Sequence, residues 1–334
     1  MKAITLISGG LDSTVATRII QDLGLELVAV NTISPFCLCN RRSSKGCAHG
    51  ANSAAKQLGL KLISVDVTND FLEIVKNPKH GYGSNMNPCI DCRILLFKKA
   101  KELMASEGAS FVITGEVLGQ RPMSQKLNTM RLIEKESGLE GLVLRPLSAK
   151  ILEETIPEKR GWLSREKLLA INGRGRREQM DLAAKLGIND YPCPSGGCLL
   201  TDPEFSKRLK DLMKYGEFDP ENIQLLKIGR HFRLDEKTKL IVGRNEKENE
   251  LLLGFAKEYD YLFMPGDELA GPTSLGRGIF SDELIGLSCG VTCRYCDIKG
   301  EPEAEIIYKK TSENDGKTVM VPPIGEDKLL SLRI

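Results

Sequence analysis

A short apolar strand that runs directly into a serine- and glycine-rich turn most constrains this chain. Residues 3–7 read Ala-Ile-Thr-Leu-Ile, and residues 8–13 read Ser-Gly-Gly-Leu-Asp-Ser. A helix from about residue 14 would complete a strand–loop–helix phosphate site, because adjacent glycines let backbone N–H groups approach an anion and the helix N-terminus adds its positive end. The turn lacks the lysine of the Gly-x4-Gly-Lys-Ser/Thr pattern, which disfavours ordinary γ-phosphoryl transfer.

The hexapeptide resembles the PP-loop of the ATP pyrophosphatases, which split ATP between the α and β phosphates and adenylate a substrate. The resemblance implies that ATP and Mg²⁺ bind here. Ser8 and Ser13 would donate hydroxyl hydrogen bonds, Gly9 and Gly10 would offer backbone N–H groups, and Asp12 would hold the metal or orient the leaving phosphates. A glycine-rich connection in another kind of α/β domain is the alternative.

Composition excludes several classes of protein. The 334 residues suffice for two domains, and the formal net charge of +2 leaves any RNA contact to local basic patches. The chain has no run of about 18 apolar residues, and its first apolar run stops at Gly9, so neither a membrane span nor a signal peptide is expected. The sequence therefore predicts a cytoplasmic protein. In that reducing compartment, ten cysteines indicate metal ligands or reactive thiols rather than disulfides.

The first part of the chain alternates between strand and helix patterns. Strands are expected at 3–7, 26–33, 61–67 and 110–115, and helices at 14–23, 50–58 and 92–107, each helix ending at a glycine, Gly24, Gly59 or Gly108. This alternation predicts an α/β domain with a doubly wound parallel sheet that binds ligands at the carboxyl ends of its strands.

The rest of the chain follows other patterns. Residues 151–190 read as helical, with a helix start at 164–167, and short apolar runs from about 220 predict a smaller α+β domain. The predicted division is a PP-loop ATP pyrophosphatase domain over 1–150, a helical extension over 151–204 and an α+β module over 205–334.

Three cysteines form a pattern that supports metal or cluster chemistry. Cys89 and Cys92 form a C-x2-C at a turn before a helix, where two thiolates can bind one metal or one cluster edge. Together with Cys198 they resemble the Asn-Pro-x-x-x-Cys and Gly-x-Cys elements of the tRNA thiolation enzymes of the PP-loop superfamily. Members with a C-x2-C and a remote cysteine hold a 4Fe–4S cluster through three ligands. The resemblance implies that these three cysteines hold such a cluster, with one iron open to sulfur, and that Cys92 and Cys198 take part in catalysis.

Two alternatives to the cluster remain at this stage. In a cluster-free sulfurtransferase, Cys198 would carry a persulfide that Cys92 resolves. A structural zinc site would need a fourth ligand such as Cys193.

The other six cysteines form two groups. Cys37, Cys39 and Cys47 flank a basic segment at 41–45. Buried free thiols explain these three as well as metal ligands or reactive thiols do. The trio Cys289, Cys293 and Cys296 has C-x3-C-x2-C spacing, but too few residues follow it for the barrel of a radical-SAM enzyme. A second metal site, zinc or iron–sulfur, is the expectation for this trio.

Residues 114–120 read Thr-Gly-Glu-Val-Leu-Gly-Gln and follow the fourth expected strand. With Ser124-Gln125 and a later Leu-Arg-Pro-Leu, they resemble the TGE-x-LGQ-x-x-SQ stretch of the tRNA 4-thiouridine synthetases. The resemblance implies that Gly115, Glu116 and Gln120 contact the nucleotide. Thr32 is placed against the adenine or ribose by its position at the end of the second strand. Alternatively, the stretch is a connecting loop in which Glu116 caps the next element.

Two later segments suggest contacts with nucleic acid. Residues 172–177 carry three arginines at a glycine-rich helix entry, which suits phosphate binding but equally a solvated helix end. Residues 241–252 resemble the VGRN-x-x-x-N signature of the NFACT-R module, which is associated with RNA. A structural turn would explain Arg244 and Asn245 equally well.

Together the resemblances imply an ATP-dependent sulfurtransferase that thiolates an RNA uridine, most naturally in tRNA. A base carbonyl would attack the α phosphate, pyrophosphate would leave, and sulfur from sulfide or a carrier protein would displace AMP. The enzymes it resembles suggest a homodimer. The THUMP and rhodanese regions of typical 4-thiouridine synthetases have no counterpart here, so the substrate and sulfur source do not carry over. Alternatives are an N-type ATP pyrophosphatase that amidates or thiolates a small molecule, and a non-catalytic RNA-binding adaptor.

Overall fold

A computed structural model of the chain describes residues 1–36, 48–191 and 198–334. The chain divides into two compact units, Met1–Asp202 and Pro203–Ile334. The division at 150 and 204 stays a prediction. Among the described residues, no helix combines the length and apolar character needed to cross a membrane.

The first unit contains a five-stranded sheet with the order β3-β2-β1-β4-β5, in which every neighbouring pair is parallel. The strands are β1 (Lys2–Leu6), β2 (Glu26–Ile33), β3 (Leu62–Asp66), β4 (Phe111–Thr114) and β5 (Val143–Leu144). The main helices are α1 (Leu11–Asp22), α2 (Ala48–Gln57), α3 (Thr68–Lys76), α4 (Cys89–Glu107), α5 (Leu127–Ser137) and α7 (Arg177–Lys185).

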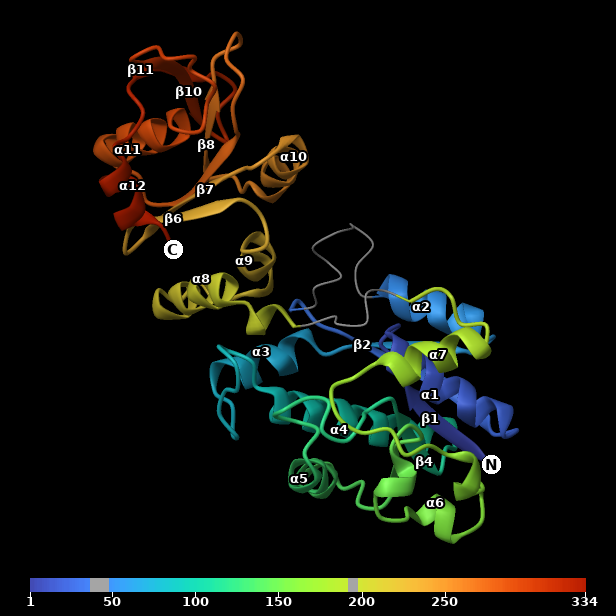
Figure 1. The fold of residues 1–334 in the computed structure, drawn as a ribbon. Coiled ribbons are helices and arrows are strands. Elements are labelled where there is room, and N and C mark those ends of the chain that lie inside the picture. Colours follow the sequence, from blue (N-terminus) through green and yellow to red (C-terminus); the bar gives the residue numbers. More distant parts are fainter. Residues whose placement is uncertain (37–47, 192–197) are drawn as a thin grey trace. The chain divides into compact units, whose positions relative to one another are not determined.

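Helices cover both faces of this sheet, because successive residues of each strand point to opposite sides (Figure 1). Ala3 and Phe111 pack with Ile20 of α1 on one face. Ile4 and Val112 pack with Phe97 of α4 on the other. The predicted doubly wound parallel sheet is thereby confirmed.

Most element boundaries agree with the sequence pattern, and the exceptions have local causes. Gly24, Gly59 and Gly108 have positive φ and follow helices, as expected for C-caps. Helix α1 begins at Leu11 rather than at residue 14, because Gly10 already serves as its N-cap. The helix start predicted at 164–167 is wrong. That stretch forms only a 3-10 turn, η3 (Arg165–Lys167), between the short helix α6 (Ile156–Lys159) and α7.

The second unit confirms the predicted smaller α+β domain. Its six-stranded antiparallel sheet has the order β11-β10-β8-β9-β7-β6. The strands are β6 (Arg230–Asp235), β7 (Thr238–Val242), β8 (Tyr261–Pro265), β9 (Ser274–Gly278), β10 (Ala304–Lys310) and β11 (Lys317–Val321). The helices are α8 (Pro203–Lys214), α9 (Pro220–Leu225), α10 (Glu246–Phe255), α11 (Asp282–Cys293) and α12 (Glu326–Leu332).

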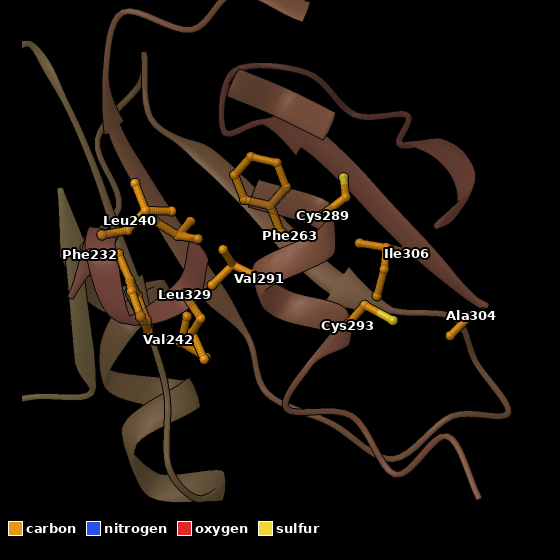
Figure 2. Close-up of a cluster of buried hydrophobic side chains, with 11 residues drawn as sticks. Phe232, Leu240, Val242, Phe263, Cys289, Val291, Cys293, Ala304, Ile306 and Leu329 are labelled. Carbon is orange, nitrogen blue, oxygen red and sulfur yellow. The ribbon is translucent and has the colours of Figure 1, made fainter. Parts of the chain in front are cut away.

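The cysteine trio of this unit lies in and beside its apolar core. Cys289 and Cys293 project from α11 into a cluster with Phe263 and Ile306 (Figure 2), and Cys296 packs against the same cluster. The Cys293 thiol donates to a backbone carbonyl of β11, and burial raises the pKa of Cys289 to about 12. Among the residues described, no group of three or more His, Cys, Asp or Glu side chains is placed to hold a metal ion. The trio therefore contributes to the apolar core, and the second metal site, zinc or iron–sulfur, stays a prediction.

Candidate nucleotide and thiol site

The loop between β1 and α1 has the hydrogen bonding of an anion-binding turn. The Ser13 hydroxyl accepts a hydrogen bond from the Ser8 backbone N–H at 3.3 Å and donates one to the Gly10 carbonyl at 3.0 Å. Gly10 is the N-cap of α1 and, within the described chain, no side chain caps that helix end. The first N–H groups of α1 therefore stay available to an anion.

Two glycines allow three chain segments to meet at this loop. A Cβ on Gly9, which has φ +75°, would lie 2.2 Å from the carbonyl carbon of Gly50. A Cβ on Gly115 would lie 2.5 Å from the carbonyl carbon of Asp12. Both distances are shorter than any real side chain tolerates, so glycine is required at both positions. Gly115, predicted to contact the nucleotide, thus lies directly against the phosphate loop.

Asp12 is largely buried in this loop and incompletely paired. Burial raises the pKa of Asp12, while Gln120, Arg176 and Arg121 oppose that rise. Its Oδ2 lies 3.8 Å from Nε of Arg176, and its Oδ1 has no hydrogen-bond partner among the described residues. A shielded carboxylate oxygen without a protein partner fits the predicted role of Asp12 toward Mg²⁺.

Glu116 belongs to a buried ion-pair network rather than to a helix cap. It is 2% exposed and lies 3.0 Å from Arg145 and 3.4 Å from Arg93, and Arg145 pairs in turn with Glu134. The carboxylate therefore fixes two guanidinium groups beneath the loop after β4. Whether Glu116 also contacts a nucleotide stays a prediction.

The other two predicted nucleotide-binding side chains lie at the same edge of the sheet. Thr32 is half-buried near the carboxyl end of β2, the strand next to β1. Gln120 is 7% exposed, and its amide lies close enough to Asp12 to lower the pKa of that carboxyl.

Hydrogen bonds join the two segments that carry the predicted cluster ligands. The Met86 backbone N–H donates to the Leu200 carbonyl at 3.1 Å, and the Asn85 amide donates to the Thr201 carbonyl at 2.8 Å. These bonds bring Cys198 to the start of α4, where Cys89 and Cys92 occupy the first turn. All three thiols are half-buried.

The three thiols also share an electrostatic environment. Burial raises the pKa of Cys92 to about 12 and that of Cys198 to about 11, and neighbouring thiolates add to both rises. The positive charge of Arg121 opposes both. The same Arg121 charge lowers the pKa of Asp12, so the thiols and the phosphate loop lie near one guanidinium group.

The structure brings the three predicted cluster cysteines to one region, and the iron–sulfur cluster itself stays a prediction. Within the described ranges, no three metal-binding side chains are close enough to hold one metal ion. A 4Fe–4S cluster is bound through different iron atoms, so its thiolate ligands stand farther apart than those of one ion. Cys193, the fourth ligand of the zinc alternative, lies outside the described residues, as do Cys37, Cys39 and Cys47.

Two arginines of this site are not predicted by any motif of the sequence. Arg93 directly follows Cys92, and Arg121 directly follows Gln120, so their position next to motif residues is the signal that could identify them. For Arg176 the sequence favours phosphate binding and a solvated helix end equally, and the structure places this side chain beside Asp12.

In the second unit, the VGRN segment forms a capped helix entry. The Asn245 side chain accepts a hydrogen bond from the Glu248 backbone N–H at 3.0 Å, and Glu248 accepts one from the Arg244 backbone N–H at 3.0 Å. Asn245 thus has a structural role as the N-cap of α10, whereas the Arg244 side chain is exposed.

Two known protein families match separate parts of the chain. Residues 1–156 match the family described as Thiamine biosynthesis protein (ThiI), and residues 229–332 match the NFACT protein RNA binding domain. The chain joins a ThiI-type region to an NFACT-type region. Both resemblances drawn from the sequence are thereby confirmed, and the ThiI-type region contains the phosphate loop, Cys89 and Cys92.

Individual relatives carry related names. A probable tRNA sulfurtransferase of Ureaplasma parvum serovar 3 is 35% identical over 163 residues, which are 46% of this chain and 38% of that protein. One from Methanosarcina mazei is 26% identical over 213 residues, 61% of this chain and 43% of that protein. The chain thus spans less than half the length of these relatives. Among solved structures, a 4-thiouridine synthetase–RNA complex with bound ATP is 22% identical with a TM-score of 0.41, covering 68% of this chain and 52% of that one.

Proposed function

We propose that the protein is an ATP-dependent RNA sulfurtransferase, with a tRNA uridine as its substrate. The names of the relatives support sulfur transfer to tRNA, and the match over 229–332 supports RNA binding. We propose sulfide or a carrier protein as the sulfur donor, and the resemblance to PP-loop thiolation enzymes supports a homodimer.

One observation carries the proposal: the loop after β4 contacts both parts of the site, because Gly115 packs against Asp12 of the phosphate loop and the Cys89 thiol lies 3.2 Å from the Ser124 hydroxyl. An enzyme that only adenylates would not need thiols beside the nucleotide phosphates. A redox or metal protein would not need an uncapped helix end behind a Ser-Gly-Gly loop. Sulfur transfer to an adenylated base needs both.

The residues divide the reaction into two steps. In the first, the base carbonyl oxygen attacks the α phosphorus, and pyrophosphate leaves with the electron pair of the broken P–O bond. The Ser8 and Ser13 hydroxyls and the N-terminal N–H groups of α1 stabilise the charge on pyrophosphate. Asp12 would hold Mg²⁺, which would neutralise part of the phosphate charge when bound. In the second step, sulfur adds to the base carbon and AMP departs.

Cys89, Cys92 and Cys198 would hold the 4Fe–4S cluster, which supplies a binding site for the sulfur anion when it is present. Iron and acid-labile sulfide in anaerobically purified protein are expected in equal amounts, and replacing any of these cysteines should lower both. Stoichiometric zinc without iron would contradict the assignment.

Paired variants test the division of labour. Asp12→Ala should abolish pyrophosphate release, whereas Cys198→Ala should retain ATP binding and lose sulfur transfer. Cys296→Ser is the matched control, because this thiol belongs to the other unit and should affect neither step. An equal loss of nucleotide affinity in Asp12→Ala and Cys198→Ala would contradict the proposal.

A further inference from the structure

The phosphate loop contains no cation of its own. Its single charged residue, Asp12, is acidic, and the lysine of other phosphate loops is missing. A nucleotide brings several negative charges to this loop, and hydroxyl and backbone donors alone do not neutralise them. Positive charge must therefore come from another part of the chain.

A third chain segment approaches the phosphate loop from the side of Gln120. Leu118 forms a β-bridge with Asn172, and the Gly173 backbone N–H donates to the Leu118 carbonyl at 2.8 Å. The segment that contains residues 172–176 is thereby attached to the loop after β4, which itself contacts Asp12 through Gly115.

This junction leaves polar atoms shielded from solvent without protein partners. They are Asp12 Oδ1, Gln120 Nε2 and Arg176 Nε, one from each of the three segments. Gln120 lies near enough to Asp12 to share its carboxylate, which leaves Arg176 Nε as the unpaired donor. Buried polar atoms are nearly always hydrogen-bonded, so this donor indicates a missing acceptor. The 3.8 Å separation between Arg176 and Asp12 is too long for a direct hydrogen bond.

Arg121 directly follows Gln120, and its exposed side chain adds positive charge to this part of the chain. A phosphate oxyanion suits the guanidinium fork best, because two parallel N–H groups match two of its oxygens.

We propose that Arg176 binds the phosphate of the nucleotide's adenylyl group, in place of the missing loop lysine, and that the charge of Arg121 adds to the attraction. Pyrophosphate is released from the α phosphate in the first step, and the α phosphate departs as part of AMP in the second. It should therefore lie between the phosphate loop and the thiols. The place of this phosphate in the reaction depends on the proposed function, whereas its binding requires only that the site takes a nucleotide.

Equilibrium binding to the full chain tests the assignment with three probes: AMP, inorganic pyrophosphate and adenosine. Arg176→Gln should weaken AMP binding about tenfold or more, the loss expected for one charged hydrogen bond, and Arg121→Gln should weaken it less. Adenosine binding should not change, and pyrophosphate binding should change less than AMP binding. Arg176→Lys should recover part of the AMP affinity, since it keeps the charge but not the fork. Arg18→Gln, which removes a surface ion pair of α1, should match the wild type.

Unchanged AMP affinity in Arg176→Gln would overturn the assignment, as would a loss confined to pyrophosphate. An equal loss for adenosine would also overturn it, because that result indicates a disturbed fold. No binding of AMP by the wild-type chain would exclude a nucleotide site altogether. Because no RNA or sulfur donor is present, a protein that binds AMP as predicted but never thiolates RNA would refute only the proposed function.

Discussion

At the scale of single residues, close backbone approach decides what the site can be. Gly9 and Gly115 each occupy a position where a Cβ would collide with backbone of another segment. The sequence motifs contain these two glycines, but they do not show that the backbone of another segment lies against each of them. The loop residues Ser8 to Ser13 were predictable because a phosphate loop is a local structure. The position of Arg176 beside Asp12 was not, because it depends on distant segments packing together.

Gly115→Ala should disturb the phosphate loop. The new methyl group would force the backbones of residues 12 and 115 apart, which we expect to cost about 1–3 kcal/mol of unfolding free energy and to weaken ATP binding. Gly175→Ala is the control for stability, since its Cβ would meet open space. Chemical denaturation followed by Trp162 fluorescence measures the difference. Equal stability of the two variants would show that the close approach is not present in solution.

At the scale of elements, periodicity and glycine positions predicted the long strands and helices well. The pattern failed where elements are too short to show a period, as in β5, which has two residues. It also failed over 151–190, where Gly161, Gly173 and Gly187 all have positive φ and divide an apparently helical stretch into short pieces. In the second unit, capping chemistry explains the VGRN segment better than any surface pattern does.

Mutations should distinguish the structural role of Asn245 from the proposed RNA contact of Arg244. Asn245→Ala should cost about 1 kcal/mol of stability, because it removes the N-cap of α10. Arg244 is the proposed phosphate contact of the RNA surface. Arg244→Gln should leave the unfolding free energy unchanged and should reduce the number of ions released on RNA binding by about one. Thermal denaturation and binding over a series of salt concentrations measure the two effects. A loss of stability in Arg244→Gln would contradict this separation.

His231 of β6 should make the second unit sensitive to acid. Burial lowers the pKa of His231 well below its ordinary value, and the charges of Lys239 and Arg208 lower it further. Below about pH 6.5 the unfolded state therefore binds more protons than the folded state, so stability falls as the pH falls, by on the order of 1 kcal/mol per pH unit. Hydrogen exchange of the β6 and β7 amides between pH 7 and 5 measures this change. His231→Asn should reduce the slope, and an unchanged slope would assign the effect to other groups.

At the scale of the whole molecule, each unit has its own sheet and its own buried core. The sequence predicted both kinds of sheet, because one part alternates strands with helices while the other has short strands separated by turns. The two units also correspond to two different functions in the proposal, nucleotide chemistry and RNA binding.

Removing residues 203–334 should therefore affect the two ligands differently. A chain of residues 1–202 should bind ATP with the affinity of the full chain, because the phosphate loop and its contacts lie within that unit. Its affinity for tRNA should fall by tenfold or more, the loss expected when several phosphate contacts are removed. Unchanged tRNA affinity would show that the second unit is not an RNA-binding module.

The stoichiometry of a single reaction tests the central claim most directly. Purified protein with its cluster is incubated with tRNA, sulfide and ATP labelled at the α phosphate, and nucleotide products and RNA nucleosides are quantified together. The account predicts AMP and pyrophosphate in equal amounts, with one thiolated uridine for each AMP. Release of ADP, or AMP formation without sulfur in the RNA, would contradict it.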